Sequence, residues 1–347
     1  MNFADADERF MRVALNEARK SLGRTSPNPA VGAILVCGGR ILARAHHTRA
    51  GEPHAEIACL HKLGGPVPAD ATLYVTLEPC STTGKTPPCT RAIIDAGVRT
   101  VVIGAVDVNP RHSGRGISEL RNAGVMLRTG VLASESLRLN EAFNKWIVTR
   151  RPFVIAKCGL SLDGRLNRPR HEQRWITDAV ARRDVHRLRA QVDAILVGAE
   201  TVRQDNPRLT VRGVKGAKQP WRVVITRSGV LPKNARLFSD RWAKRTIVYR
   251  HKSLAAVLQD LGRQEIVSVL LEGGGRLLGA ALDGGLIDKV QIYLGPILTG
   301  GGVAAFAGRG AFSTQAAEHL EDVTYTEIGQ SIRITGYLRN AAKELGE

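Results

Sequence analysis

Two short stretches of the sequence combine residue types that bind and activate metal ions. One is a His-Ala-Glu stretch with His54 and Glu56, and the other is "TLEPCSTTGKTPPC", with Cys80 and Cys89. One neutral imidazole and two thiolates form a tetrahedral zinc site whose fourth position is open to water, which is the catalytic arrangement. Zinc lowers the pKa of its bound water to about 7 and so supplies hydroxide, and Glu56 would carry protons. This donor set with a His-x-Glu is typical of zinc nucleobase deaminases.

The ends of helices and strands are expected to bring these side chains together. A Pro and a Gly-Gly pair bracket a helix predicted over 54–63. A strand over 71–77 would end just before Cys80, and a helix over 88–96 would begin beside Cys89. Since a helix N-terminus favours negative charge, a thiolate is easier to form there.

The order of strand-like and helix-like segments predicts the fold class. After an amphipathic N-terminal helix, apolar runs alternate with helical stretches, which predicts an α/β/α sandwich with a mixed sheet. A Pro-containing linker at 150–152 ends this pattern, and a second alternating pattern follows, so we expect two α/β domains, 1–148 and 152–342. The expected strands are 30–36, 40–45, 71–77, 100–106, 125–130, 152–160, 193–198, 221–227, 245–250, 266–275 and 289–298, and the expected helices 54–63, 88–96, 115–123, 134–148, 178–190 and 274–282.

The net charge of +18 points to anionic partners. Nucleic acid is one candidate, and a phosphorylated metabolite together with a dinucleotide is another. The basic residues are scattered along the chain, and aromatic residues make up only 5% of it, which is poor for stacking single-stranded bases. Nucleic acid is therefore the weaker interpretation.

Composition also indicates the compartment. No stretch approaches the roughly 20 apolar residues that span a bilayer, and the N-terminus lacks the basic and apolar regions of a signal peptide. We expect a cytoplasmic protein without structural disulfides. Cys37, Cys59 and Cys158 lie in apolar or helical segments and are expected to be ordinary core or surface residues.

Three segments of the first half, "TSPNPAVGAILV", "HTRAGEPHAE" and "TLEPCSTTGKTPPC", resemble the deaminase domain of the bifunctional riboflavin-biosynthesis enzyme. That family joins a diaminohydroxyphosphoribosylaminopyrimidine deaminase to a 5-amino-6-(5-phosphoribosylamino)uracil reductase. The resemblance implies a cytidine-deaminase-like fold, zinc on the donor set above, and Glu56 as the proton carrier. It also implies substrate contacts from Asn28, His47 and Lys85, with Lys85 suited to the ribose phosphate.

One position departs from that family. After Glu-Pro-Cys-Ser the family often has His, where this chain has Thr82. A hydroxyl donates a hydrogen bond but carries no charge. One substrate contact at this position therefore stays open, while the zinc chemistry is unaffected.

Segments of the second half, "AKCGLSLDGRL", "QRWIT", "VGAETVRQDNPRLTVR" and "LLEGGGRLLGAAL", resemble the reductase domain of the same family, which has a dihydrofolate-reductase-like fold and uses NADPH. The glycines before the last helix do not match G-x-G-x-x-G, so a Rossmann fold is not supported. By themselves they fit either a tight turn or a phosphate at a helix N-terminus. The resemblance implies cofactor contacts from Gly159, Trp175, Thr201, Asp205, Gly274, Gly275, Arg276, Leu277, Leu278, Gly279 and Ala280. It implies substrate contacts from Gln173, Arg189, Leu209, Arg212 and Glu272, the arginines being suited to the ribose phosphate.

Four positions of the second half stay open. Lys157 and Asp163 either orient the sugar or shuttle protons, or they form an ion pair at a strand end. Gln173 stands where the family often has Ser, and Asn206 where it often has Asp. The contacts made by Gln173 and Asn206 therefore stay open. The reductase assignment rests on the other segments.

Two other classes of function share some of these features. A nucleic-acid deaminase would use the same zinc donors and explain the charge of +18, but it requires a basic, aromatic-rich face, and the chain has few aromatic residues. A non-catalytic, zinc-stabilised binding protein needs no proton carrier, so Glu56 beside the His ligand argues against it. The sequence therefore favours a bifunctional enzyme that uses Zn²⁺ and NADPH on a phosphorylated pyrimidine. Family resemblance suggests a homo-oligomer, either a dimer or a tetramer.

Overall fold

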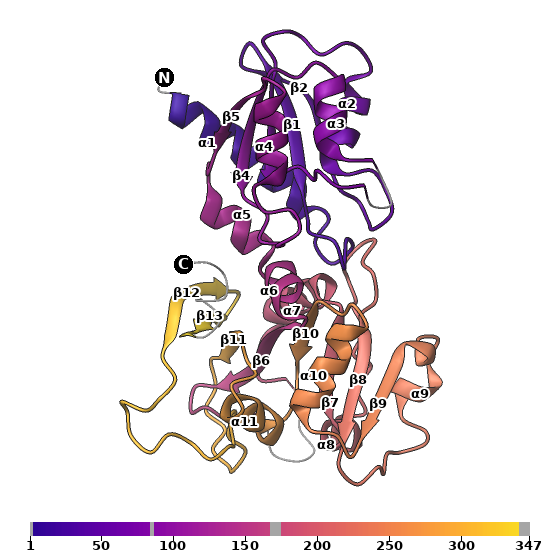
Figure 1. The fold of residues 1–347 in the computed structure, drawn as a ribbon. Coiled ribbons are helices and arrows are strands. Elements are labelled where there is room, and N and C mark those ends of the chain that lie inside the picture. The colour runs from indigo at the N-terminus through magenta and orange to yellow at the C-terminus, as the bar shows by residue number, and fades with distance from the viewer. Residues whose placement is uncertain (1–2, 84–86, 167–174, 340–347) are drawn as a thin grey trace. The chain divides into compact units, whose positions relative to one another are not determined.

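The computed structural model describes residues 3–83, 87–166 and 175–339 of the chain (Figure 1). The chain forms two compact units, Met1–Thr149 and Arg150–Glu347. Among the described residues, no helix is both long enough and apolar enough to cross a membrane. Two of the predicted substrate contacts, Lys85 and Gln173, lie outside the described residues.

The first unit is built on a mixed sheet, which has five strands in the described part of the chain in the order β2-β1-β3-β4-β5. β1 pairs antiparallel with β2 and with β3, whereas β3, β4 and β5 run parallel. The predicted α/β class and mixed sheet are confirmed. The strands are β1 (Gly32–Cys37), β2 (Arg40–His46), β3 (Thr72–Leu77), β4 (Thr100–Ala105) and β5 (Met126–Thr129), and the helices are α1 (Phe3–Arg19), α2 (Ala55–Leu63), α3 (Cys89–Asp95), α4 (Arg115–Asn122), α5 (Ala133–Leu139) and α6 (Glu141–Thr149).

Helices cover both faces of this sheet because successive strand side chains point to opposite faces. In β1, Ile34 packs with the apolar side of α1, and Leu35 packs in the other core layer with Cys59 of α2. Gly32 is required for the close approach of α1, since a Cβ there would lie 2.1 Å from the Ala14 carbonyl oxygen. The result is the predicted α/β/α sandwich.

The single helix predicted over 134–148 is wrong. The structure has two helices, α5 and α6, separated at Asn140. The buried Asn140 side chain accepts a hydrogen bond from the backbone nitrogen of Ala30 at 2.8 Å and donates one to its carbonyl oxygen at 3.0 Å. This contact, which no helical periodicity reveals, fixes the start of α6 beside the Pro-Asn-Pro segment before β1.

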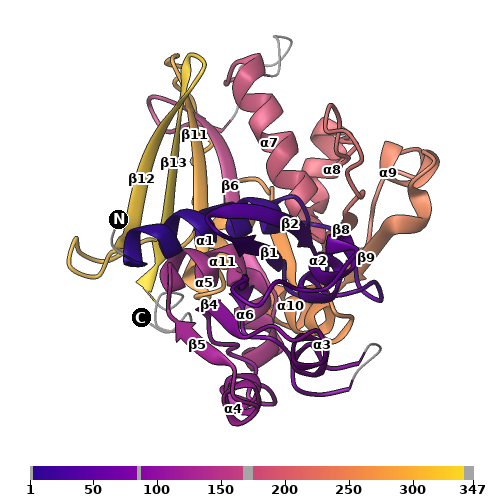
Figure 2. The same cartoon turned by 90° about the horizontal axis from the view of Figure 1, so that it is seen from above.

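The second unit contains a larger sheet, with eight strands among the described residues in the order β12-β13-β11-β6-β10-β7-β8-β9. The strands from β11 to β9 are parallel, and β13 and β12 continue the sheet antiparallel as a long hairpin (Figure 2). The strands are β6 (Phe153–Ser161), β7 (Ala194–Gly198), β8 (Trp221–Thr226), β9 (Thr246–Arg250), β10 (Ser268–Leu271), β11 (Lys289–Gly295), β12 (Leu320–Ile328) and β13 (Ser331–Leu338), and the helices are α7 (Ala179–Gln191), α8 (Ala199–Asp205), α9 (Arg236–Ser239), α10 (Leu254–Arg263) and α11 (Gly275–Asp283).

Helices also cover both faces of this second sheet. On one face, Val257 of α10 and Leu278 of α11 pack in the main core with residues of the parallel strands. On the other face, Val185 of α7 packs with Tyr293 of β11. The hairpin β12–β13 and the helices α8, α9 and α10 were not predicted.

Candidate active sites

The predicted zinc ligands come together in the first unit. His54 immediately precedes α2, Cys80 follows the end of β3, and Cys89 begins α3. Their donor atoms lie within 4.8 Å of one another, with His54 Nδ1 3.2 Å from Cys89 Sγ and 3.5 Å from Cys80 Sγ. One imidazole and two thiols at these separations fit a zinc ion.

Hydrogen bonds among the ligands determine their charges when no metal is bound. The thiol of Cys89 donates to Cys80 and, together with the nearby His54, lowers the pKa of Cys80 to about 4. The same hydrogen bond, with burial, raises the pKa of Cys89. The pKa of His54 is also raised, chiefly by its hydrogen bond to the Cys80 sulfur. A zinc ion replaces these protons, so metal binding at this site releases protons.

Glu56 lies beside the ligands in the first turn of α2. Its side chain is buried and forms a hydrogen bond with Cys89. Burial, and then the negative charge of Cys80, raise the pKa of Glu56 to about 7. A carboxyl group that titrates near neutral pH both accepts and donates protons efficiently, so Glu56 has the position and the pKa of a general acid–base group.

His54, Glu56 and Cys80 line a cavity of about 300 Å³ within the first unit. Two of the predicted substrate contacts, Asn28 and His47, belong to its wall. The aromatic side chains of Phe143 and Trp146 on α6 form another part of the wall, which the sequence analysis did not identify. A cavity of this size, with apolar walls and a few polar groups, suits a small heterocyclic ligand.

The His47 imidazole is fixed in one orientation in the cavity wall. Its Nδ1 lies 3.1 Å from the Pro53 carbonyl oxygen, and its Nε2 lies 3.1 Å from the Asn28 side-chain nitrogen. Because a carbonyl oxygen only accepts, we assign the proton to Nδ1, and Nε2 accepts from Asn28. Burial lowers the pKa of His47 and so favours this neutral ring. His47 thereby orients the Asn28 amide.

Glu78, which the sequence analysis did not identify, connects the end of β3 to the loop before α4. Its buried carboxylate accepts hydrogen bonds at 2.9 to 3.2 Å from described backbone nitrogens of Asp107, Gly114, Gly116 and Ile117. A carboxylate is favoured at a helix N-terminus, as here at α4. Its position in the Glu-Pro-Cys turn, two residues before a metal ligand, was the available signal.

The loop held by Glu78 adds further polar groups to the cavity. Asp107, Asn109 and His112 belong to the cavity wall, although none was predicted. The exposed Thr82, the position that departs from the family, has its Oγ1 3.4 Å from His112 Nδ1. An imidazole from another loop therefore lies beside the hydroxyl at this position.

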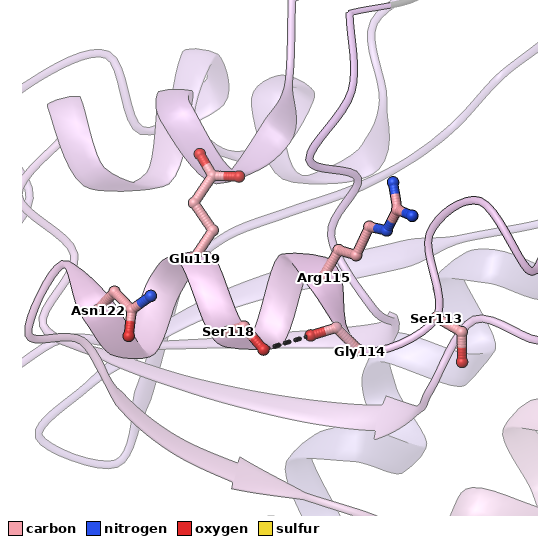
Figure 3. A pocket seen from close by; sticks show the side chains of 6 residues that line it. All are labelled: Ser113, Gly114, Arg115, Ser118, Glu119 and Asn122. Atoms are coloured by element: carbon pink, nitrogen blue, oxygen red, sulfur yellow. Dashed lines mark hydrogen bonds between the residues drawn. The ribbon is translucent and has the colours of Figure 1, made fainter.

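An open hollow along α4 is separate from this cavity. Figure 3 shows the residues that line it, which are Ser113, Gly114, Arg115, Ser118, Glu119 and Asn122. The Ser118 hydroxyl donates to the Gly114 carbonyl oxygen at 2.8 Å. The hollow shares no described residue with the zinc cavity, so we assign it no part in the chemistry.

Several predicted cofactor contacts lie at one edge of the second sheet. Gly159 belongs to the C-terminal half of β6, Thr201 and Asp205 belong to α8 directly after β7, and Gly274 precedes α11 after β10. The strands β6, β10 and β7 are parallel neighbours. Their carboxyl ends therefore meet at the edge where open α/β sheets bind ligands.

Part of the predicted glycine-rich segment serves packing. A Cβ on Gly275 would lie 2.0 Å from the Ala304 carbonyl oxygen, and one on Gly279 would lie 2.2 Å from the Gly308 nitrogen. Leu278 is fully buried in the core. These residues let the segment around 304–308 pack against α11, so packing is one reason for their residue types.

The start of α11 has a different environment. A Cβ on Gly274 would meet no described atom within 4 Å, and no described side chain caps the helix. Arg276 and Ala280 are exposed, and Leu277 is partly buried. Within the predicted segment, the helix N-terminus at Gly274 is thus the part open to an anionic group.

Arg189 and Glu272, both predicted substrate contacts, bind each other. Arg189 Nε and Nη2 donate to the two Glu272 carboxylate oxygens at 2.6 and 2.7 Å, and Arg189 Nη1 donates to the Thr210 carbonyl oxygen at 3.2 Å. Burial alone would raise the pKa of Glu272, but the charges of Arg189 and Lys157 lower it to about 2. The fork of Arg189 is therefore occupied by Glu272, which stays ionised.

The segment that carries Leu209 and Arg212 has an unusual backbone. Leu209 has φ 49° and Asn206 has φ 41°, a left-handed conformation that Asn tolerates and Leu rarely adopts. The Asn206 side chain accepts from the Arg236 backbone nitrogen at 2.8 Å, and the Arg212 backbone nitrogen donates to His186 Nδ1 at 3.2 Å. Strained residues of this kind are concentrated at binding sites.

Three remaining candidates of the second unit, Trp175, Lys157 and Asp163, each have different neighbours. Trp175 is half exposed, and the Arg182 guanidinium lies 4.9 Å from the centre of its ring. Lys157 Nζ lies 5.9 Å from the centre of the Tyr293 ring. Hydrogen bonds from Ser161 and from the backbone of the 299–300 turn lower the pKa of Asp163 to about 2. Asp163 therefore holds that turn.

Comparisons with known proteins match both units. A family model described as "RibD C-terminal domain" matches residues 152–334, and one described as "Cytidine and deoxycytidylate deaminase zinc-binding region" matches residues 4–105. The riboflavin biosynthesis protein RibD of Synechocystis sp. is 40% identical, over 96% of this chain and 96% of its own.

Two solved structures extend the match to the fold. The diaminohydroxyphosphoribosylaminopyrimidine deaminase/5-amino-6-(5-phosphoribosylamino)uracil reductase of Thermotoga maritima is 36% identical, with a TM-score of 0.89 over 97% of this chain and 100% of that one. RibD of Acinetobacter baumannii is 33% identical, with a TM-score of 0.88 over 96% of this chain and 99% of that one. The chain belongs to the RibD family, and it is a bifunctional deaminase and reductase of riboflavin biosynthesis that uses zinc and NADPH.

Proposed function

We propose that residues 1–148 carry out the deamination and residues 152–342 the reduction. The first reaction converts 2,5-diamino-6-(5-phosphoribosylamino)pyrimidin-4(3H)-one to 5-amino-6-(5-phosphoribosylamino)uracil, and the second reduces the ribosyl side chain to ribityl. The name of the similar Thermotoga maritima protein supports these substrates. The observation that carries the proposal is the meeting of the zinc donor set and Glu56 in one cavity of the first unit.

In the deaminase site, His54, Cys80 and Cys89 would hold a zinc ion, which would supply the activation of water. Glu56 is placed to accept a proton and to deliver one to the departing amine. Water adds, ammonia leaves, and the ring carbon becomes a carbonyl. Since the pKa of Glu56 is raised to about 7, both transfers are accessible near neutral pH.

Other cavity residues position the substrate of the deaminase. Asn28, oriented by His47, offers an amide to the polar edge of the pyrimidine. The rings of Phe143 and Trp146 provide an apolar wall for its face. Lys85 completes the proposed contacts and is assigned to the ribose phosphate.

In the reductase site, NADPH supplies the hydride. The N-terminus of α11 at Gly274 is assigned to a cofactor phosphate, and the remaining proposed cofactor contacts are Gly159, Trp175, Thr201, Asp205, Gly275, Arg276, Leu277, Leu278, Gly279 and Ala280. Arg189 acts by holding Glu272, and the proposed substrate contacts are Gln173, Leu209, Arg212 and Glu272. The largely buried, ionised Glu272 is suited to accept hydrogen bonds from sugar hydroxyls.

We also propose that the protein is a cytoplasmic homo-oligomer, a dimer or a tetramer, with no nucleic-acid partner. The phosphorylated substrate and the polyanionic cofactor account for part of the net charge of +18.

A two-step assay tests the proposed function. Zinc-loaded protein is incubated with the diaminopyrimidinone ribose phosphate while ammonia is measured, and NADPH is then added while its oxidation is followed. We expect ammonia first and NADPH oxidation second. The Glu56→Gln variant should keep its zinc, lose roughly 10²- to 10⁴-fold in deamination rate, and still oxidise NADPH when the uracil intermediate is supplied. Zinc-replete protein that releases no ammonia would refute the deaminase assignment.

A further inference from the structure

His112 is a polar side chain of the zinc cavity to which the reaction above gives no role. It lies in the loop between β4 and α4, far along the sequence from the metal ligands, yet it belongs to the same cavity as His54 and Glu56. Its Nδ1 lies 3.4 Å from Thr82 Oγ1.

The backbone around His112 is held firmly in place. The His112 nitrogen donates to the Asn109 carbonyl oxygen at 2.8 Å, and the His112 carbonyl oxygen accepts from the Arg115 nitrogen at 2.8 Å. Glu78 holds both ends of the loop through the nitrogens of Asp107 and Gly114. The imidazole is therefore presented from a defined backbone position, as a binding contact requires.

The position of His112 also indicates which end of the substrate it meets. The reacting end of the cavity is buried, because Cys89 and Glu56 have exposed fractions of 0% and 3%. Thr82, by contrast, is exposed, so the Thr82–His112 pair lies on the solvent side. The pyrimidine ring must reach Glu56, and its strongly hydrated phosphate is then left on the solvent side.

We propose that His112, oriented by Thr82, is a substrate-contacting residue of the deaminase and donates a hydrogen bond to the phosphate of its substrate. Where Nδ1 accepts from the Thr82 hydroxyl, Nε2 carries the proton and is the donor. An imidazole on one loop and a hydroxyl on another thus form one recognition unit. This inference rests on the proposed substrate.

The test measures affinity without turnover. Zinc-loaded Glu56→Gln protein is titrated by calorimetry with the diaminopyrimidinone ribose phosphate and, separately, with its dephosphorylated form. Adding His112→Ala should weaken binding of the phosphorylated compound roughly tenfold, in the range expected for a hydrogen bond to a charged group. Binding of the dephosphorylated compound should change less than about twofold, which a general disturbance of the cavity would not allow.

Two further variants separate the alternatives. Thr82→Val keeps the imidazole but removes its orienting hydroxyl, and it should weaken phosphate-dependent binding by about threefold. Arg111→Ala removes a neighbouring exposed cation and should leave the ratio of the two affinities unchanged. Equal losses for both compounds in His112→Ala, or no loss with zinc content and melting temperature intact, would overturn the proposal. If the His112→Ala variant loses its zinc, the Thr82→Val variant alone tests the proposal. An unchanged ratio of the affinities for the two compounds in Thr82→Val would then refute the proposal.

These outcomes are distinct from failure of the proposed function. If the parent Glu56→Gln protein binds neither compound and the unmodified protein releases no ammonia, the substrate assignment itself is wrong. If the parent binds both compounds equally, the phosphate is not recognised in this cavity, and the role of His112 is refuted while the deaminase stands.

Discussion

The two candidate sites differ in how closely their functional groups are gathered. In the first unit, three donor atoms lie within 4.8 Å of one another, and Glu56 contacts one of them. In the second unit, the candidate residues are distributed over β6, α8, α11 and the segment after α8 along a sheet edge. The ligands explain this difference, because zinc is held by side chains at about 2.0–2.3 Å, whereas a dinucleotide extends over several elements and is bound partly by backbone groups.

The two sites should therefore respond differently to substitution. A site made of a few side chains around one ion loses its chemistry when one of them is removed. A site made of many weak contacts loses affinity gradually, and its residues are also needed for packing. The predictions below test that contrast.

The largest effect is expected at a zinc ligand. Cys89→Ser should release the metal and lower deamination by roughly 10³-fold or more, since activation of water depends on the ion. Reduction of the uracil intermediate by NADPH should stay within about twofold. Metal content and the two rates are the measurements. Cys37→Ser, at a thiol outside the cavity, is the control. A joint loss of both activities would contradict the separation into two sites.

The next largest effect is expected at Glu272. Glu272→Gln leaves Arg189 buried without its negative partner and should destabilise the protein by about 3–5 kcal/mol, the usual cost of breaking a buried pair. Urea unfolding measures this change. Glu200→Gln, at an exposed pair with Arg203, is the matched control and should leave stability nearly unchanged, because exposed ion pairs contribute little. Similar losses of stability in the two variants would mean that the Arg189–Glu272 pair stabilises the protein no more than an exposed ion pair does.

Neighbouring glycines of the second site should respond in opposite ways. Gly275→Ala places a Cβ against a backbone carbonyl and should lower stability by about 1–3 kcal/mol. Gly274→Ala has space for the Cβ and a φ of −72° that Ala adopts, so stability should be unchanged while NADPH binding weakens roughly tenfold, the scale of one hydrogen bond to a charged group. Calorimetric titration and melting curves distinguish the two. Unchanged NADPH affinity in Gly274→Ala would remove the helix N-terminus from the cofactor site.

The smallest effects are expected in the dependence of stability on pH. The pKa of Glu272 is lowered from 4.5 to about 2, so its contribution is present above about pH 4.5 and is lost as the pH falls toward 2. Burial, and then Arg189 and Arg212, lower the pKa of His186 from 6.5 to about 4. Stability should therefore also decrease as the pH falls from 6.5 to 4, because the unfolded chain binds a proton that the folded protein resists.

Two variants identify the groups behind these losses of stability. The loss between pH 4.5 and 2 should be missing in Glu272→Gln, and the loss between pH 6.5 and 4 should be missing in His186→Gln, as measured by urea unfolding at each pH. A loss between pH 6.5 and 4 that persists in His186→Gln would mean that another group causes it.

The sequence predicts the fold class and the zinc donor set because both depend on local pattern. Strand alternation and helix starts are visible within a few residues, and His54, Cys80 and Cys89 have few other reasons to occupy those positions. The break at Asn140 depends on a contact with Ala30, more than a hundred residues away. Likewise, the contacts of Glu78 with the loop before α4, and the place of His112 in the cavity, follow only from the placement of that loop beside the end of β3.

In the second unit, long-range contacts limit prediction further. Gly275 and Gly279 were predicted as cofactor contacts from the family resemblance, and the structure adds that a segment some thirty residues later packs against them. Arg189 was assigned to a phosphate by its residue type, although its fork is occupied by Glu272. The strands β12 and β13 were also missed, although residues 331–335 of β13 alternate polar and apolar side chains.

The carboxylate of Glu78 has a consequence for the motions of the first unit. It joins the backbone amides of Asp107, Gly114, Gly116 and Ile117 to a single side chain. When that side chain withdraws, all of these amides become accessible together, and hydrogen exchange should show them opening as one cooperative group. The loop that carries His112 is thus expected to open as one unit and not residue by residue.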